Sequence, residues 1–403
     1  MLTVSDYIEV ARQPELAEPL IDNSAGRFHR SEQRAPVIVW NVCRNCNMSC
    51  PHCYAAATEK PSPQTLSTQE GLDLIEQMAA CGIQVLIFSG GEPLMREDLF
   101  ELIERAYALG MSTHLSTNGV LINTDVARRL EAAGIGYVGV SIDGLEAFND
   151  SYRGLVGGYR RAIEGLANAR SAGMKTGLRI TLTQKNLDQL APLIERARRI
   201  PVDRFYVSHL LYAGRAAAMQ RADLSPAQTR ETLLWLFDTA DALLGEADAP
   251  RFVTGGNDSD GALLVRWLRE RYGEEAAQRV RRLLELRGGN SAGEGILNVD
   301  HLGRVHPDQF WRQETLGSIK AHRFAEILAH PLRKQLRERR SKLRGRCQSC
   351  RWVELCRGSH RERALAHFGD RWGADPACVM TDAEVAFGID APTPLTSLEE
   401  GHA

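Results

Sequence analysis

The stretch VIVWNVCRNCNMSCPHCYAAAT, residues 37–58, contains the features that decide the fold and the chemistry of this chain. Residues 37–42 are mostly apolar and rich in valine, and they predict a buried strand. Cys46, Cys50 and Cys53 follow closely. Because the three thiols are so near to one another in sequence, a loop that curls after the strand can direct them all at one soft metal centre. The segment therefore predicts a strand that leads into a metal-binding loop.

Cysteine usage in the rest of the chain supports metal binding. Of nine cysteines, seven form two groups, and the second group consists of Cys347, Cys350, Cys356 and Cys378. Disulfides are rare in the cytoplasm, so clustered cysteines in a cytoplasmic chain are usually metal ligands or catalytic groups. Cys43 and Cys81 lie outside both groups, and we expect each to be a buried thiol without a metal.

Length and composition bound the class of protein. The chain has 403 residues with a net charge of −2, and 43% of its residues are hydrophobic, which is ordinary for a globular protein of two or three domains. The near-neutral charge removes the basic footprint expected of a nucleic-acid-binding protein. No run approaches the length of a membrane span, and the N-terminal residues contain early acids and no apolar signal core. We therefore expect a cytoplasmic protein without a nucleic-acid or membrane partner.

Strands and helices alternate through the first half of the chain. The predicted strands are 37–42, 84–90, 111–119, 137–143, 175–183 and 204–211. The predicted helices start near residue 68 and then cover 97–109, 124–133, 158–172 and 186–199. Such alternation predicts an α/β fold with a parallel sheet and right-handed crossovers.

The pattern changes after residue 214. Segments 225–248 and 262–286 have helical periodicity, and 295–311 predicts a hairpin with Leu302-Gly303 near its turn. We expect five parts: an N-terminal segment that is polar and irregular in pattern, a parallel α/β domain, a helical connector, a domain that holds the second cysteine group, and a loosely ordered tail. Their expected bounds are 1–35, 36–224, 225–294, 295–388 and 389–403.

The spacing of the first cysteine group favours an iron–sulfur cluster, and zinc is the alternative. Structural zinc sites use four ligands, commonly in two close pairs, whereas Cys46, Cys50 and Cys53 provide three unless Cys43 or His52 joins them. Three ligands on a four-iron cluster would leave one iron open to a small molecule.

The CxxxCxxC spacing, the preceding strand and the barrel-like alternation resemble the radical S-adenosylmethionine (SAM) family. The aromatic residue of its signature is Tyr54 here, and His52 stands before the last cysteine. The resemblance implies a partial (β/α)6 parallel barrel and a 4Fe–4S cluster on Cys46, Cys50 and Cys53. It also implies that the open iron binds SAM and that reduction yields a 5′-deoxyadenosyl radical.

Further residues stand where that family binds SAM. Gly90, Gly91 and Glu92 end the second predicted strand and resemble the motif for the SAM amino group, although such a sequence alone usually forms a turn. The resemblance places Ser116, Asn118, Ser141 and Asp143 near the ribose and carboxylate of SAM, with helix capping as the alternative. Two arginines, Arg153 and Arg179, are candidates for the SAM carboxylate or for surface ion pairs.

The second cysteine group has enough thiolates for a closed site. Without context, its Cys-x2-Cys half-site would favour zinc. The arrangement resembles the C-terminal SPASM-type extension of radical SAM enzymes, which carries up to two auxiliary 4Fe–4S clusters. The chain departs from the full pattern at His360 and at His306-Pro307-Asp308, where cysteines are missing. We therefore expect one auxiliary 4Fe–4S cluster on four cysteines, without Asp308 or His360 as ligands.

Segments 28–58 and 303–319 resemble the NirJ-like subgroup, whose members act in heme d1 biosynthesis during denitrification. This resemblance implies an oxidoreductase or lyase that removes two propionates from a didecarboxysiroheme-type tetrapyrrole, with flavodoxin or ferredoxin as electron donor. Heme synthases acting on iron-coproporphyrin and SPASM peptide-modifying enzymes are the alternatives. A peptide-modifying enzyme would need a module before the barrel, and only about 35 residues precede the first strand. Candidate substrate contacts, each with a structural or solvated alternative, are His209, His306, Arg30, Arg34 and Arg304.

Overall fold

The computed structural model describes residues 1–17, 35–200 and 202–386, and its contacts divide them into two compact units. The barrel unit comprises the described residues of 33–222 and 291–337. The helical unit comprises the described residues of 1–32, 223–290 and 338–403. The five-part division expected from the sequence stays a prediction.

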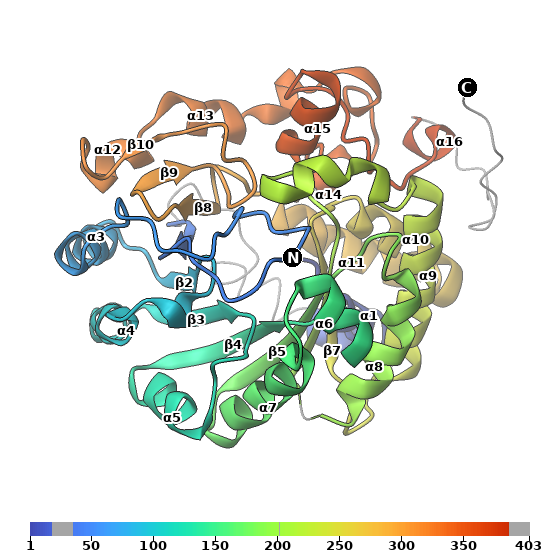
Figure 1. The fold of residues 1–403 in the computed structure, drawn as a ribbon. Helices are drawn as coiled ribbons and strands as arrows, with labels where there is room; N and C mark the ends of the chain where they lie inside the picture. Colours follow the sequence, from blue (N-terminus) through green and yellow to red (C-terminus); the bar gives the residue numbers. More distant parts are fainter. Residues whose placement is uncertain (18–34, 201, 387–403) are drawn as a thin grey trace. The chain divides into compact units, whose positions relative to one another are not determined.

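Six parallel strands form the main part of the sheet in the barrel unit (Figure 1). They are β1 (Val37–Asn41), β2 (Val85–Ser89), β3 (Ser112–Thr117), β4 (Ile135–Ser141), β5 (Lys175–Thr181) and β6 (Arg204–Ser208), and each pairs with the next. All six lie within the segments predicted from the sequence, except that β4 begins two residues earlier than expected. The predicted parallel sheet is therefore confirmed.

Beyond β1 the sheet continues through the later segment of the barrel unit. β8 (Ile296–Val299) is parallel to β1, β9 (Arg304–His306) is antiparallel to β8, and the short β10 (Gly317–Ser318) is antiparallel to β9. The turn between β8 and β9 contains Gly303, whose φ of +82° requires glycine. The predicted hairpin at 295–311 is therefore confirmed.

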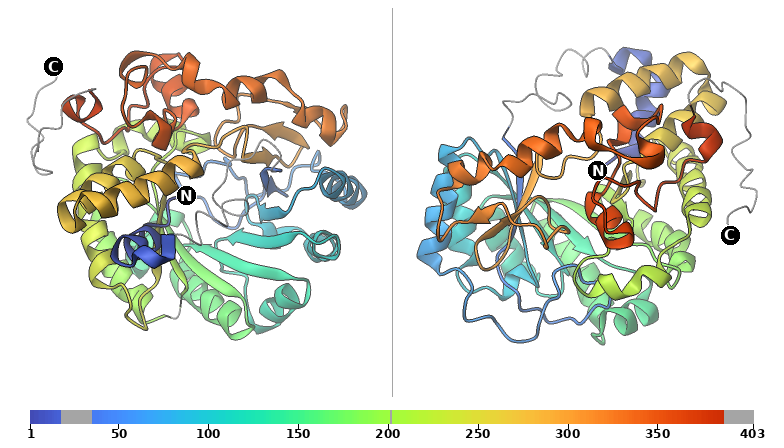
Figure 2. Two further views of the ribbon diagram at one scale, coloured as in Figure 1. Left: turned by 180° about the vertical axis from the view of Figure 1, so that it is seen from behind. Right: turned by 90° about the horizontal axis from the view of Figure 1, so that it is seen from above.

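Five helices cover the outer face of the parallel strands in the barrel unit, as the views in Figure 1 and Figure 2 show: α3 (Thr68–Ala80), α4 (Leu99–Ala108), α5 (Thr124–Ala132), α7 (Gly158–Ser171) and α8 (Leu190–Arg198). The unit also contains α6 (Glu146–Arg153), α12 (Phe324–Leu328) and α13 (Pro331–Arg337). Short 3-10 turns occupy Pro93–Met95, Leu187–Gln189 and Gly214–Ala222. α3 starts with a capping box, in which Ser67 and Glu70 satisfy each other's backbone N–H groups.

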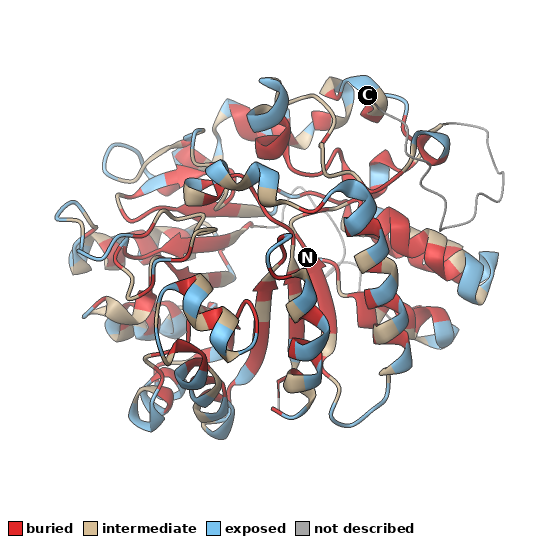
Figure 3. Ribbon diagram, turned by 45° about the vertical axis from the view of Figure 1, so that its right-hand side comes forward, coloured by how far each residue is buried: buried red, intermediate tan, exposed pale blue. Residues whose placement is uncertain are grey.

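The two faces of the strands differ in chemistry. The face against the helices is apolar and buried, with Leu115, Val138, Leu178 and Phe205 at 0% exposure (Figure 3). The inner face is polar and partly exposed, and its residues include His114, Ser116, Tyr137, Ser141, Arg179 and Tyr206. Because polar side chains occupy alternate positions of these parallel strands, and Ser116, Ser141 and Arg179 lie in their carboxyl-terminal halves, a binding site is expected on the inner face.

The helical unit is mostly α-helical. Its elements are α1 (Val4–Arg12), α9 (Pro226–Ala242), β7 (Arg251–Gly255), α10 (Asp260–Tyr272), α11 (Glu274–Arg287), α14 (Val353–Cys356), α15 (Arg361–Phe368) and α16 (Asp382–Val385), with 3-10 turns at Pro14–Leu16, Arg339–Lys342 and Gly345–Cys347. α1 packs against α11 and α10. Leu2, which precedes α1, forms an isolated antiparallel β-bridge with Thr254 of β7.

One expectation for this unit is wrong. The N-terminal segment, expected to be polar and irregular, forms α1, with Val4, Tyr7, Ile8 and Ala11 buried along one face. Segment 262–286 is helical, as its periodicity indicated, and it divides into two helices because Gly273 adopts a φ of +86° between them. In the part of the chain that the structure describes, no helix is long and apolar enough to cross a membrane.

Candidate active site

The first cysteine group forms a loop at the end of β1. The loop closes at its base where Cys46 N donates to Thr58 O at 2.8 Å. Cys50 is buried, whereas Cys46 and Cys53 are partly exposed. Ala57 N approaches the Sγ of Cys53 at 3.5 Å. The structure thus keeps the three cysteines in one partly accessible loop.

Burial opposes ionisation of the thiols in this loop, and at Cys50 it outweighs the nearby charge of Arg153. Burial raises the pKa of the Cys46 thiol to about 12, and burial also raises the pKa of Cys50. Thiolate, the metal-binding form, is therefore disfavoured until a positively charged group binds. Three soft sulfur ligands with nearby N–H donors fit an iron–sulfur cluster.

Gly90 and Gly91 lie against the backbone of the cysteine loop. Gly91 N donates to Cys43 O at 2.9 Å, and Glu92 N donates to Asn45 O at 2.8 Å. A Cβ atom on Gly91 would lie 2.1 Å from Asn45 O. Glycine is needed here because two backbones approach closely, which places the end of β2 beside the loop.

Glu92 connects the ends of β2 and β3. Its carboxylate is fully buried and accepts hydrogen bonds from Thr117 Oγ1 at 2.6 Å and from Asn118 N at 2.8 Å. Burial raises the pKa of Glu92. The amide of Asn118 donates to Asn47 Oδ1 at 2.6 Å and lies 3.9 Å from Cys46 Sγ. Glu92 and Asn118, both predicted from the sequence, thus lie beside the first cysteine.

Asp143, which follows β4, is the centre of a buried ionic network. Arg153 Nη1 donates to its Oδ2 at 2.6 Å, His52 Nε2 lies 3.1 Å from the same oxygen, and Thr181 N donates to Oδ1 at 3.0 Å. Burial alone would raise the pKa of Asp143, but the charges of His52 and Arg153 hold it well below its usual range. The carbonyl of Arg153 lies 4.0 Å from Cys50 Sγ. The network therefore joins β4 and α6 to the cysteine loop.

Arg179 lies deeper in the barrel unit than Arg153. Its Nη1 donates to Ser116 Oγ at 2.8 Å. On the strands, Arg179 is in register with Ser141, and Ser116 is in register with Gly139. The side chain of Arg179 therefore points away from the cysteine loop. Its guanidinium lies level with Ser116 and Gly139, which are one row of side chains farther from the loop than Ser141.

Two of the candidate substrate contacts, His209 and His306, are buried, whereas Arg304 is exposed. His209 is buried directly after β6. His306 is buried, with Nδ1 2.7 Å from Glu314 O and Nε2 3.4 Å from Asp300 Oδ2. Arg304 is ion-paired with Asp300 at 2.8 Å. These contacts agree with the structural alternative for His306 and place Arg304 in an ion pair. Two further candidates lie outside the described residues: Arg30 and Arg34.

The predicted Tyr54 is held by Asn41, and neither Asn41 nor Arg215, which also contacts the cysteine loop, was predicted. The hydroxyl of Tyr54 accepts from Asn41 Nδ2 at 3.0 Å and lies 3.1 Å from Ser89 Oγ. Arg215 Nε donates to Cys50 O at 2.8 Å. A polar residue at the end of an otherwise apolar strand was the available signal for Asn41. Arg215 is distant in sequence and carried no such signal.

The second cysteine group lies in the helical unit. Its four cysteines line one small cavity, and Arg346, Trp352, Val353, Met380 and Val385 line it with them. Cys378 is partly exposed and the other three cysteines are buried. Burial raises the pKa of all four thiols. The structure therefore brings together the four cysteines that the sequence grouped.

The remaining cysteines and the two residues excluded as ligands lie elsewhere. Cys43 is buried, as expected, with its Sγ 3.2 Å from Glu92 O. Cys81 is partly exposed, so the expectation of a buried thiol is wrong, because the residue caps the end of α3. His360 is absent from the lining of the cavity. Asp308 accepts backbone hydrogen bonds within its own turn in the barrel unit.

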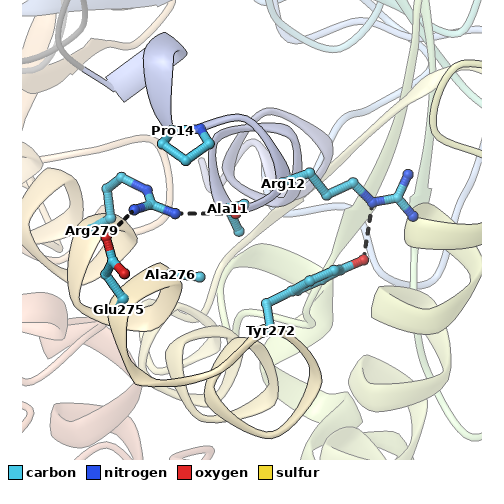
Figure 4. A pocket seen from close by; sticks show the side chains of 7 residues that line it. All are labelled: Ala11, Arg12, Pro14, Tyr272, Glu275, Ala276 and Arg279. Atoms are coloured by element: carbon cyan, nitrogen blue, oxygen red, sulfur yellow. Dashed lines mark hydrogen bonds and ion pairs between the residues drawn. The ribbon is translucent and has the colours of Figure 1, made fainter.

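A second cavity in the helical unit, of about 590 Å³, does not contain any predicted site residue (Figure 4). Its arginines already have partners in the protein. Arg12 Nε donates to the hydroxyl of Tyr272 at 3.0 Å, and Arg279 donates to Ala11 O at 3.3 Å. We assign no function to this cavity.

Comparisons with known proteins identify the family. The family described as the radical SAM superfamily matches residues 40–197. The chain is 39% identical to the pre-heme d1 synthase of Dinoroseobacter shibae, over 88% of this chain and 89% of that protein. It is 38% identical to the Fe-coproporphyrin III synthase of Methanosarcina barkeri, over 89% of this chain and 91% of that protein.

A solved structure supports the fold. Streptococcus suis SuiB bound to precursor peptide SuiA matches with a TM-score of 0.66 at 18% identity, over 86% of this chain and 76% of that chain. The predicted fold class, a radical SAM partial barrel with an additional domain, is confirmed. Membership of the family implies SAM and a 4Fe–4S cluster as cofactors. The chain belongs to the radical SAM superfamily and is an enzyme that uses SAM radical chemistry.

Proposed function

We propose that this enzyme acts in heme d1 biosynthesis and removes two propionate side chains from a didecarboxysiroheme-type tetrapyrrole. The observation that carries the proposal is the 39% identity to a pre-heme d1 synthase over 88% of the chain. Relatives named for heme or coproporphyrin synthesis also match over most of the chain, so a tetrapyrrole is the best-supported class of substrate.

In this proposal, Cys46, Cys50 and Cys53 hold the SAM-binding cluster. When bound there, the cluster and SAM supply the electron transfer and the radical for hydrogen abstraction. The chain's own residues position these groups. Tyr54 and Arg215 hold the cysteine loop through the contacts described above.

SAM itself would be oriented by residues around the loop. The close packing of Gly90 and Gly91 brings backbone groups at the end of β2 beside the cluster, where they can accept from the SAM amino group. The hydrogen bond from Asn118 N to the carboxylate of Glu92 holds the ends of β2 and β3 together. Ser141 lies at the end of β4. Of the two candidate arginines, we assign the SAM carboxylate to Arg153, because its backbone and Asp143 contacts place it beside the loop.

We assign one auxiliary 4Fe–4S cluster to Cys347, Cys350, Cys356 and Cys378. Four thiols line one cavity, which supports a closed site with four cysteine ligands. Its role would be to accept or relay the electron released when a side chain is lost. A small acidic redox protein such as flavodoxin or ferredoxin would be the external donor.

The experiment that tests the substrate is anaerobic incubation of the reconstituted enzyme with didecarboxysiroheme, SAM and a reductant. We expect stepwise loss of two propionate masses by mass spectrometry, together with 5′-deoxyadenosine. Preparations without SAM are the control. No loss of mass, with SAM still cleaved, would refute the assignment.

One observation favours a second candidate. A relative named AdoMet-dependent heme synthase, from Nitratidesulfovibrio vulgaris, is 30% identical over 85% of this chain and 91% of that protein. An enzyme acting on the propionates of an iron-coproporphyrin would share the same SAM site. Parallel incubations with iron-coproporphyrin, and with a peptide substrate as the more distant alternative, distinguish these activities by which mass changes.

A further inference from the structure

Two arginines on the inner face of the barrel unit are not neutralised by any carboxylate in the described part of the chain. Arg179 donates to Ser116 Oγ at 2.8 Å, and neither Arg179 nor Arg204 is ion-paired with a described Asp or Glu. In contrast, Arg153 is paired with Asp143 at 2.6 Å. The two arginines therefore retain both positive charge and hydrogen-bond donors.

Both guanidinium groups lie near one aromatic ring. The Cζ atoms of Arg179 and Arg204 are 5.8 Å and 5.6 Å from the ring centre of Tyr137. Arg179 is also 5.9 Å from the ring of Tyr206. These contacts orient the cations but do not neutralise them, and two like charges near one ring repel each other. An anion between them would remove that repulsion.

Two glycines make room for this arrangement. A Cβ atom on Gly139 would lie 2.5 Å from Cζ of Arg179, and one on Gly177 would lie 2.0 Å from the hydroxyl oxygen of Tyr137. Glycine within a strand usually costs stability, and here it lets the arginine and tyrosine side chains lie flat across the neighbouring strand. The strands are thus built around these two side chains.

His114 lies beside the two arginines. Burial, together with the charges of Arg179 and Arg204, lowers the pKa of His114 to about 4. The ring of His114, whose centre is 5.7 Å from that of Tyr137, is therefore neutral near pH 7. A ligand group that binds here meets two cations, a serine hydroxyl and neutral rings.

We propose that Arg179 and Arg204, together with the hydroxyl of Ser116, bind a carboxylate of the tetrapyrrole substrate that the reaction leaves in place. This inference rests on the proposed function and names its substrate-orienting residues. A planar guanidinium can donate two parallel hydrogen bonds to a carboxylate. Because a tetrapyrrole carries several acidic side chains on its rim, anchoring one of them fixes which other side chain faces the SAM-binding loop.

The test measures binding of didecarboxysiroheme and of its methyl ester, which lacks the charges, to the reconstituted enzyme by anaerobic absorbance titration. Loss of a charge-assisted contact predicts that Arg179→Gln binds the free acid about tenfold more weakly. The ester should bind the variant and the parent enzyme equally. Arg204→Gln should show a smaller loss, because Arg204 is exposed.

Three further variants serve as controls. Arg179→Lys keeps the charge but not the paired donors, so it should recover part of the affinity. Ser116→Ala removes the proposed hydroxyl contact without changing any charge, so it should weaken binding of the free acid and leave binding of the ester unchanged. Arg160→Gln removes an exposed arginine that is paired with Glu146 on the helices, and it should change nothing.

The outcomes separate this inference from the proposed function. If Arg179→Gln weakens the acid and the ester equally, the arginine is merely structural, and the inference is overturned. If SAM binding, measured by equilibrium dialysis, falls instead, Arg179 serves SAM and the inference is also overturned. If the parent enzyme neither binds nor converts didecarboxysiroheme, the proposed function itself fails.

Discussion

The two cysteine groups have different surroundings. In the barrel unit, three cysteines lie in a loop next to polar groups, including Asn118 and the Asp143–Arg153 ion pair, and two of the three are partly exposed. In the helical unit, four cysteines line a cavity whose other walls are largely apolar, and three of the four are buried.

This difference matches two tasks. A site that must admit a small molecule needs an incomplete ligand set, an accessible side and polar groups for that molecule. A site that only transfers electrons is better closed, because a complete ligand set in a shielded cavity limits loss of metal and access of solvent. We therefore expect the cluster on the barrel cysteines to be needed for SAM binding and cleavage. We expect the cluster on the other four cysteines to be needed for conversion of the substrate.

The largest expected effect is that of Cys50→Ala. Removal of one of three ligands should eliminate the SAM-binding cluster, so formation of 5′-deoxyadenosine should fall to background. Iron content should fall from about eight to about four atoms per chain, as for two four-iron clusters. The matched control is Cys81→Ala, which removes a thiol outside both groups. SAM cleavage at the parent rate by Cys50→Ala would contradict the ligand assignment.

Cys356→Ala should separate the two sites. Iron content should again be halved, but SAM binding and SAM cleavage without substrate turnover should remain. Conversion of the tetrapyrrole should be lost. Iron analysis, electron paramagnetic resonance of the reduced enzyme and product analysis measure these outcomes. Loss of SAM binding with the first cluster intact would show that the cysteines were divided wrongly.

Local sequence patterns predicted most of the barrel unit. Most of its strands are short apolar runs, and its helices show helical periodicity. Each of these signals can be detected within a short stretch of sequence. α1 was missed although Val4, Tyr7, Ile8 and Ala11 have helical spacing, because the segment was interpreted through its polar composition. The break at Gly273 also had a local signal that was not used.

The candidate site was predictable only where its residues are neighbours in sequence. The spacing of Cys46, Cys50 and Cys53 is local, and so is that of Gly90 and Gly91. The contact of Arg215 with Cys50 O joins residues 165 positions apart, and no local pattern encodes it. Contacts between residues distant in sequence also distinguish the two predicted arginines. Arg153 is bonded to Asp143 beside the cysteine loop, whereas Arg179 is bonded to Ser116 away from it.

The next expected effect concerns the ion pairs beside the cysteine loop. Asp143→Asn leaves Arg153 buried without its anion, which should cost about 3–5 kcal/mol in the free energy of unfolding. Denaturant unfolding measures this cost, and Asp125→Asn, at an exposed helical ion pair, is the matched control. An effect of the same size at both positions would contradict the assignment of a buried network.

Asp143 also predicts a pH dependence. Its folded-state pKa lies below the unfolded value of about 3.9, so the unfolded chain binds more protons in acid. The stabilisation is therefore present above that value and is lost as pH falls below it. The difference in unfolding free energy between parent and Asp143→Asn should shrink from about pH 5 downward. A difference that stays constant over this range would show that Asp143 is not a depressed carboxylate.

The smallest of these effects tests whether each cysteine site can be disturbed alone. Both sites have a glycine packed against the cysteine-bearing backbone. A Cβ atom would lie 2.1 Å from Asn45 O at Gly91, and 2.6 Å from Leu355 O at Gly289. Overpacking of this kind should cost about 1–3 kcal/mol for Gly91→Ala and for Gly289→Ala. Gly136→Ala, where the nearest atom is 3.9 Å away, is the control.

The two variants should differ in which cluster they weaken. Gly91→Ala displaces the backbone of the barrel loop, so it should speed iron loss from the SAM-binding cluster and weaken SAM binding. Gly289→Ala displaces the backbone next to Cys356, so it should affect only the auxiliary cluster. Iron release to a chelator over time, with SAM binding measured in parallel, distinguishes the two. Equal loss from both clusters in either variant would mean that the sites do not hold metal independently. In that case the contrast between an open SAM site and a closed auxiliary site would not explain their stability.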